Sequence, residues 1–251
     1  ALMIASSEAG STTAVRLSLG LHNEFYLDSI CWTGERNGGT STYNFNSANS
    51  YALFRGIDGG RMSVWAQGDA SGPGVAGSNV RGRDVNFSNG KVDALIDRLY
   101  LTRSSTNSSG ATIQGVLTIG GNYPGSIFDV NTAYIGNQDV LNLHDPSGIE
   151  DRTFGNTFGN LIVQSNAVFK VNGDLHLAYT VASNPGLPDQ PEDVQGRLNI
   201  NNSGILMANN IAAGRFSSSE IVMTAGGNLI VTNGIGTSEL PLTILDMNNS
   251  I

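Results

Sequence analysis

The sequence predicts an all-β protein that folds as a right-handed parallel β-helix (a β-solenoid) with irregular coils and loop insertions on one face. Three observations predict this class. Apolar residues alternate with polar ones at a period of two, as in strands. The same order of strands and turns recurs along the chain. Gly, Asn, Ser and Thr, which favour tight turns and weaken helix interiors, are abundant, and Gly alone occupies 32 of 251 positions.

The repeat is clearest in residues 196–214. An apolar pair two apart, Leu198 and Ile200, precedes a polar turn, and a second strand then leads through Asn209 to Ile211. One coil cannot bury its own apolar side chains, so stacked coils are expected to form the core together. Related copies begin near Leu17, Val85, Leu117, Leu161, Ile221 and Leu245, and the last two steps are 23 and 24 residues (198 to 221 and 221 to 245).

We expect a single solenoid domain over residues 1–251, and both ends look like cuts within a longer chain. The segment 43–82 fits the repeat less well than the rest. Extra residues follow the second strand of three coils, at about 102–115, 137–158 and 178–195. Because all three insertions occur at one point of the coil, we expect them to line one face of the solenoid.

An Asn or Asp recurs at one corner of the repeat. These residues tolerate left-handed backbone and cap turns through their side chains. Stacking brings them into a column, which we interpret as a structural hydrogen-bonded ladder, with a row of ligands as the alternative. The column consists of Asp28, Asp97, Asn131, Asn172, Asn209 and Asn233.

A second column contains Tyr100, Tyr134 and His176, each one residue past a buried aliphatic position. The period of two turns these side chains away from the core. Such a stripe covers exposed sheet or lies under a loop, or it forms a sugar-stacking or protein-docking surface. Cys31 occupies the same column and is expected to be a small buried or half-buried hydrophobe, with a reactive thiol as the alternative.

Catalytic and metal-binding motifs are scarce. The three histidines lack metal-ligand spacing, and no nucleophile motif or P-loop is present. We expect no cofactor. Acidic residues gather in two of the insertions, where carboxylates suit calcium, and solvated loops are the alternative. The weak calcium candidates are Asp139, Asp145, Glu150, Asp151, Asp189, Glu192 and Asp193.

Charge and hydropathy exclude other classes. The net charge of −8 argues against a nucleic-acid partner, which requires a basic face. No apolar run approaches the roughly 20 residues of a membrane span. The first residues do not read as a signal peptide, so we expect any export signal to lie outside this sequence.

Three stretches resemble the coils of large secreted β-solenoid proteins of Gram-negative bacteria: residues 17–30, 51–69 and 92–101. That group includes autotransporter-type passenger domains and the long repeat surface proteins of Verrucomicrobia and Planctomycetes. The resemblance implies export, an extracellular or cell-surface location and a structural or adhesive role, and it carries over no catalytic residues.

The sequence thus predicts a non-enzymatic extracellular structural or adhesive solenoid. Its expected partners are further copies of itself, joined head to tail or laterally into a fibre or surface layer, or a cell-surface or carbohydrate ligand. The alternative is a carbohydrate-binding or carbohydrate-active β-helix protein, a polysaccharide lyase or hydrolase, that uses the insertion-lined face.

Overall fold

The computed structural model describes residues 2–4, 16–32, 40–69, 81–104, 113–138, 157–180, 194–214 and 217–248. Their strands form two sheets in which every pairing is parallel, and none of these residues is helical. No helix that is long and apolar enough to cross a membrane occurs among them. The predicted all-β solenoid is therefore confirmed.

Ten strands form one sheet, which we call sheet A. They are β1 (Leu2–Ile4), β3 (His22–Tyr26), β4 (Ser29–Trp32), β6 (Ser50–Arg55), β7 (Met62–Asp69), β9 (Gly90–Ser104), β11 (Ser126–Gln138), β13 (Ala167–Thr180), β15 (Ile205–Ala213) and β17 (Asn228–Ile235). Eight strands form sheet B. They are β2 (Arg16–Leu19), β5 (Thr40–Phe45), β8 (Arg81–Asn86), β10 (Ile113–Ile119), β12 (Thr157–Val163), β14 (Val194–Asn201), β16 (Ser218–Thr224) and β18 (Ile244–Asn248).

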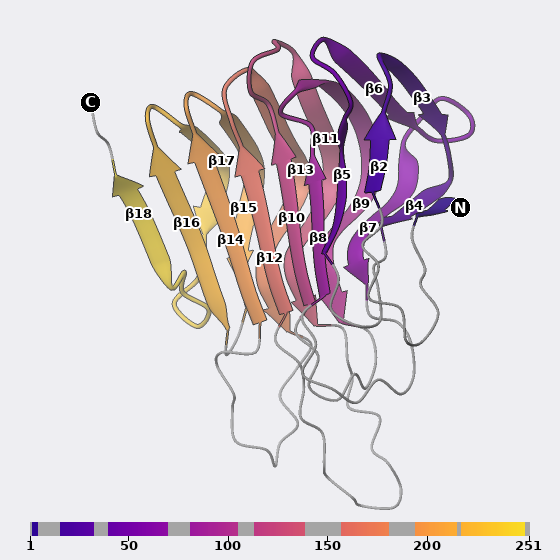
Figure 1. Cartoon of the computed structure of the whole chain (residues 1–251). Coiled ribbons are helices and arrows are strands. Elements are labelled where there is room, and N and C mark those ends of the chain that lie inside the picture. The colour runs from indigo at the N-terminus through magenta and orange to yellow at the C-terminus, as the bar shows by residue number, and fades with distance from the viewer. Residues whose placement is uncertain are drawn as a thin grey trace, which may run out of the picture.

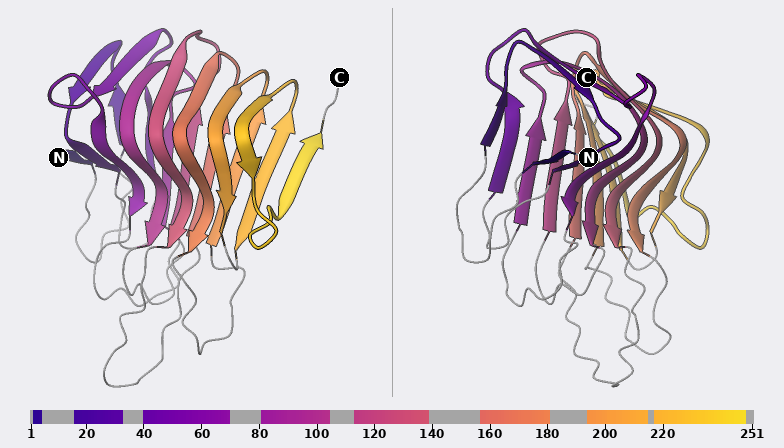
Figure 2. Two further views of the ribbon diagram at one scale, coloured as in Figure 1. Left: turned by 180° about the vertical axis from the view of Figure 1, so that it is seen from behind. Right: turned by 90° about the vertical axis from the view of Figure 1, so that its right-hand side faces the viewer.

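The chain alternates between the sheets and advances along one axis. In Figure 1 it rises along sheet B in front, crosses the top and descends along sheet A behind, while moving from the N-terminal to the C-terminal end. Seen along the axis from the N-terminal end, this path is clockwise and recedes from the viewer (Figure 2). The coil is therefore right-handed, which is the hand that parallel crossovers adopt.

Each coil is one sheet B strand plus the sheet A segment that follows it. The turns from sheet B to sheet A are tight, and Asn166 and Asn202 adopt left-handed φ values of 65° and 51° there, as expected for Asn in turns. The three predicted insertions all connect sheet A back to sheet B. Strands extend a few residues into each of them, and residues 105–112, 139–156 and 181–193 lie outside the described part of the chain.

The core lies between the two sheets. In β12 and β14 every second residue is buried, and Leu161, Val163, Leu198 and Ile200 have no exposed surface. Parallel pairing places them in columns, Leu161 beside Leu198 and Val163 beside Ile200. The apolar alternation read from the sequence is therefore the inward face of the strands.

The irregular segment 43–82 has a structural cause. Strand β9 pairs with β6 through its first half and with β7 through its second half. The turn between β6 and β7 is an excursion, and Gly56 and Gly60 close it with a backbone hydrogen bond of 2.8 Å. One continuous strand of the later coils is thus interrupted in this coil, which hides the repeat in the sequence.

Candidate functional site

Sheet A bends at the corner where the Asn and Asp residues recur. Ile96 and Leu99 are both buried, so the two residues between them, Asp97 and Arg98, face outward in succession. Strands β11 and β13 shift register at this corner, between Val130 and Ala133, where β13 has one residue more than β11. Such an extra residue is a β-bulge, which bends the strand and leaves polar side chains on the outer surface.

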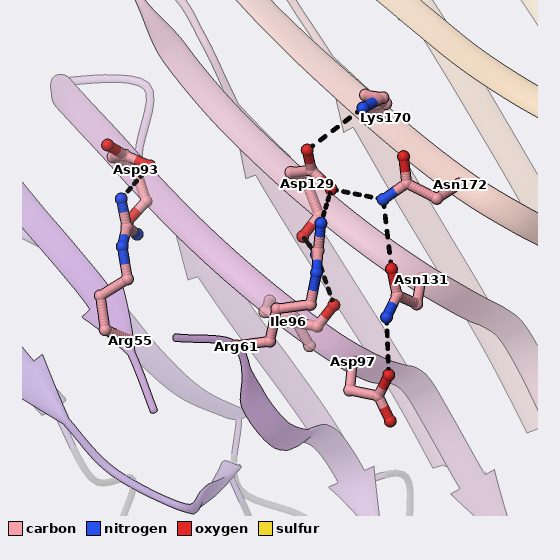
Figure 3. Close-up of polar contacts among 9 residues, drawn as sticks. All are labelled: Arg55, Arg61, Asp93, Ile96, Asp97, Asp129, Asn131, Lys170 and Asn172. Carbon is pink, nitrogen blue, oxygen red and sulfur yellow. Dashed lines mark hydrogen bonds and ion pairs between the residues drawn. The ribbon is translucent and has the colours of Figure 1, made fainter. Parts of the chain in front are cut away.

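The bulges bring most of the predicted ladder together. Asn131 Nδ2 donates to Asp97 Oδ1 at 2.8 Å, and Asn172 Nδ2 donates to Asn131 Oδ1 at 3.2 Å (Figure 3). Asn209 Nδ2 donates to the backbone oxygen of Asn172. These contacts link four successive coils along the axis, and each satisfies a polar group at the corner.

The two ends of the ladder differ from this pattern. Asp28 accepts a hydrogen bond of 2.6 Å from Ser63 Oγ, and Ser63 occupies the register position between Asp28 and Asp97. Asn233 lies on the exposed strand β17, opposite the register shift at Asn209. No hydrogen bond joins Asn233 to Asn209 in the described structure.

An ion-pair network crosses the coils beside the ladder (Figure 3). Arg61, from the excursion, donates to the backbone oxygens of Ile96 at 3.1 Å and Asp129 at 2.7 Å. Its second guanidinium nitrogen lies 2.5 Å from Asp129 Oδ1. Lys170 approaches the other carboxylate oxygen at 3.4 Å, and Asn172 donates to Asp129 at 2.6 Å. Arg61 thus crosses β9 and reaches Asp129 on β11, and Asn172 on β13 binds the same carboxylate. Asp129 therefore connects the coil of Arg61 to two later coils.

Electrostatics favour the charged form of Asp129. Burial alone raises the pKa of this carboxyl, but hydrogen bonds from Arg61 and Asn172, with the charges of Arg61 and Lys170, outweigh burial and lower the pKa. With a lowered pKa, the carboxyl of Asp129 is deprotonated at neutral pH and has no proton to donate. Asp129 is therefore suited to holding coils together and unsuited to general acid chemistry at neutral pH.

Asp129→Asn is expected to lower the free energy of unfolding at pH 7 by about 1–2 kcal/mol, because charge-assisted hydrogen bonds at a partly exposed site are lost. Since folding lowers the pKa, the carboxylate contributes stability above its ordinary value of 3.8. That contribution disappears as the pH falls through the folded-state pKa. Urea unfolding at pH 7 and near pH 3 measures the difference between the two proteins.

The exposed carboxylate Asp246 on β18 provides the control, and Asp246→Asn is expected to change stability by less than about 0.5 kcal/mol. A gap between Asp129→Asn and the original protein that stays constant with pH would show that the loss is not electrostatic.

The second column forms a stack of rings on the outer face of sheet A. Tyr100 and Tyr134 have ring centroids 5.0 Å apart and planes 11° apart. Tyr134 and His176 are 4.6 Å and 8° apart. Parallel pairing places the three residues side by side, so ring stacking follows the solenoid axis. Tyr100 is only 8% exposed.

A fourth ring joins this stack. Ala178 has a left-handed φ of 53°, and the alternation shifts at this residue. Tyr179 then meets Tyr134 edge-on at 5.4 Å and His176 edge-on at 5.2 Å. Burial lowers the pKa of His176, and Asp174 opposes this shift, so the imidazole is neutral at pH 7. Stacking of this kind favours cohesion between coils.

The calcium candidates lie outside the described residues. Within the described ranges, no group of three or more His, Cys, Asp or Glu side chains is arranged to hold a metal ion. Asp139, Asp145, Glu150, Asp151, Asp189, Glu192 and Asp193 all belong to the segments 139–156 and 181–193. A calcium site there stays a prediction.

Sequence reasoning missed four residues of this surface: Ser63, Arg61, Asp129 and Tyr179. Arg61 and Ser63 belong to the interrupted coil, where the repeat supplies no register. Asp129 lies two residues before the ladder residue Asn131 and therefore shares its outward face. The period of two could have identified Asp129 from the sequence. Tyr179 was hidden because alternation is broken at Ala178.

Comparison with models of protein families, with curated proteins and with solved structures finds no match to this chain.

Proposed function

We propose that the protein is a non-enzymatic structural or adhesive β-solenoid that acts outside the cell or on its surface. The observation that carries this proposal is the use of the polar side chains on the outer face of sheet A. Asp97, Asn131, Asn172 and Asp129 bind partners on neighbouring coils. Groups engaged in this way stiffen a rod and are not available to transfer protons to a substrate.

Composition supports an exterior location. The surface carries few lysines, since only Lys91 and Lys170 occur in the whole chain, and it is rich in Asn, Ser, Thr and Gly. Together with the tightly paired backbone of a solenoid, this composition suits a wall that resists proteases. The resemblance of the coils to secreted solenoid proteins points in the same direction.

Enzyme assays with the purified chain test the proposal. It is incubated with pectin, xylan, chitin and β-glucan, and both reducing ends and unsaturated uronates are measured. No turnover above buffer is expected. Turnover that follows the protein through purification would replace the structural role with a lyase or hydrolase. Surface proteolysis of intact source cells tests the location.

A carbohydrate-binding role is the second candidate, and the ring stack favours it. Tyr179 lies nearly equidistant from Tyr134 and His176, so it lies beside the stack and not across the outer face of His176. The neighbouring position on β15 is Ala212, whose small side chain leaves room beside that face. A sugar ring that stacks on His176 would extend the column by one step.

Binding to a glycan library tests this second candidate. A ligand of the stack is expected to lose at least about tenfold in affinity with His176→Ala. Tyr26→Ala, at a ring 50% exposed on β3, is the control and leaves the affinity unchanged. Melting with calcium and with a chelator is measured in parallel, because an ion bound to the native state raises the melting temperature.

A further inference from the structure

The outer face of sheet B is straight and carries few charges. Figure 1 shows its strands side by side without a bend, whereas Figure 2 shows the strands of sheet A bending in the middle. The central strands β8, β10, β12 and β14 are each paired on both sides. Among their outward positions whose side chains the structure describes, Asp84 on β8 and Arg197 on β14 are the charged ones. The middle of this face is therefore suited to contact another flat surface.

Apolar side chains occupy the centre of this face. Val116 on β10 and Phe158 and Ile162 on β12 alternate with buried residues and are themselves half-buried. The two strands are neighbours, and Thr118 lies beside Ile162 in register. On the flanking strands the corresponding positions are Asn86 and Asn199. An apolar centre with a polar surround is the arrangement found in protein interfaces.

The two charged residues lie on opposite sides of the apolar centre. Asp84, Val116, Asn160 and Arg197 follow one another in register across the four strands. Burial raises the pKa of Asp84, and no described residue forms an ion pair or hydrogen bond with its carboxylate. Each of these charges therefore lies one strand away from the central pair of strands.

Arg197 can accept a second carboxylate as partner. Its Nε lies 3.6 Å from Glu220 Oε2, and no described residue accepts a hydrogen bond from its guanidinium, which carries five N–H donors. On sheet A, by contrast, Asp93 and Asp129 both pair with arginines of the same chain. The charges that are left for a partner thus belong to sheet B.

A two-fold axis makes this face complementary to itself. An axis parallel to the strands, between β10 and β12, turns the face over and reverses the order of the strands, while each residue keeps its level along its strand. Asp84 then lies opposite Arg197 of the other copy, and this occurs twice. The remaining central pairs are Val116 with Asn160, Thr118 with Ile162, Gln114 with Phe158 and Asn86 with Asn199.

We propose that the outer face of sheet B binds the same face of a second copy of this chain, about a two-fold axis between β10 and β12. Two ion pairs between Asp84 and Arg197 then flank a shared apolar centre. This inference rests on the proposed structural role and names a partner for it. A contact of one surface with itself is closed, so association stops at the dimer.

The size of the face is sufficient for a dimer. The six strands from β5 to β16 are about 4.8 Å apart and six to eight residues long, and they present roughly 650 Å² of flat surface. A specific interface needs about 500 Å² or more from each partner. Since the axis is parallel to the strands, the strands of both copies run in the same direction, as in aligned sheet packing.

Sedimentation of the purified chain over a range of concentration tests the proposal. A monomer–dimer equilibrium is expected. Ile162→Lys places a charge at the centre of the contact and is expected to raise the dissociation constant at least about tenfold, while circular dichroism shows that the variant remains folded. Ile127→Lys, at an isoleucine 41% exposed on the outer face of sheet A, is the matched control and dimerises normally.

Charge reversal tests the two-fold axis itself. Asp84→Arg and Arg197→Asp each bring like charges together in their own dimers, so each variant is expected to dissociate at least about tenfold more readily. An equimolar mixture of the two variants restores both opposite-charge pairs, and a heterodimer is expected. The double variant Asp84→Arg/Arg197→Asp is expected to dimerise with itself for the same reason.

Four outcomes would each overturn the proposal. They are a chain that stays monomeric at every concentration, a dimer that Ile162→Lys leaves intact, a mixture that associates no better than its separate variants, and assemblies that keep growing beyond the dimer. Turnover of a polysaccharide would instead remove the proposed structural role. A monomeric chain without turnover keeps that role and loses only the second copy as its partner.

Discussion

Gly196→Ala is expected to destabilise the protein by about 3 kcal/mol or more, although it adds a single methyl group. A Cβ at this position would lie 2.2 Å from the backbone oxygen of Ile135 and 2.5 Å from the backbone nitrogen of Ala178. Both contacts are with backbone inside paired strands of sheet A. No flexible side chain is available to move aside.

The reason is a column of glycines that lies directly against the backbone of sheet A. Gly115, Gly159 and Gly196 pair in register along sheet B. Across from them, sheet A turns through the left-handed residues Thr102, Gly136 and Ala178. A Cβ on Gly159 would likewise lie 2.4 Å from the nitrogen of Gly136. Backbone packs on backbone here, so side chains have no room.

Urea unfolding followed by circular dichroism measures the loss. Gly234→Ala is the matched control, because a Cβ there meets nothing within 4 Å, and it is expected to change stability by less than about 0.5 kcal/mol. If Gly196→Ala prevents folding, Gly115→Ala grades the effect, because the atom nearest to a Cβ there is a side-chain methyl of Thr102 at 2.8 Å and not a backbone atom. Equal stability of the Gly196 and Gly234 variants would show that the sheets can separate.

The glycine column illustrates what the sequence could reveal. Each of these glycines stands two residues before the first apolar residue of its repeat, Leu117, Leu161 or Leu198. The periodicity was therefore available, and the alternation it belongs to predicted the strands, their inward faces and the corner at Asn131. Local patterns of period two carry this information because each strand must bury one face.

Contacts that depend on register across an irregular turn could not be predicted. Arg61 and Asp129 are separated by 68 positions, and their meeting requires the excursion after β6 to place Arg61 over β9. The repeat does not predict the strand register there, because the turn between β6 and β7 replaces a single residue of the later coils. For the same reason, the sequence left Trp65 without a place in the fold.

Trp65→Ala is expected to lower the free energy of unfolding by about 3–5 kcal/mol, the range of a buried tryptophan truncated to alanine. Trp65 has no exposed surface. Its ring lies 5.2 Å from Trp32, 5.1 Å from Phe54 and 5.4 Å from Phe128, measured between centroids. Trp65 is the shared neighbour of these three aromatic side chains, so its truncation to alanine leaves a cavity between them.

The position of Trp65 explains why a small residue, Ala94, fits between two phenylalanines in the neighbouring column. Phe54, Ala94 and Phe128 follow one another in register along sheet A. Ala94 leaves space between the two phenylalanine rings, and Trp65 and Phe87 both contact those rings. The interior is therefore filled by complementary sizes on neighbouring strands, which is how close packing is reached.

Urea unfolding at neutral pH measures the loss, with Leu21→Ala as the control, because Leu21 is 65% exposed and should contribute less than about 0.5 kcal/mol. Trp65→Phe keeps a ring and is expected to lose less than Trp65→Ala, which separates cavity formation from misfolding. A loss below about 1 kcal/mol for Trp65→Ala would mean that Phe54 and Phe128 close over the vacated space. In that case the irregular coil would be stabilised by the network of Arg61 and by the ion pair of Arg55 with Asp93, at 2.9 Å, instead of by its aromatic core.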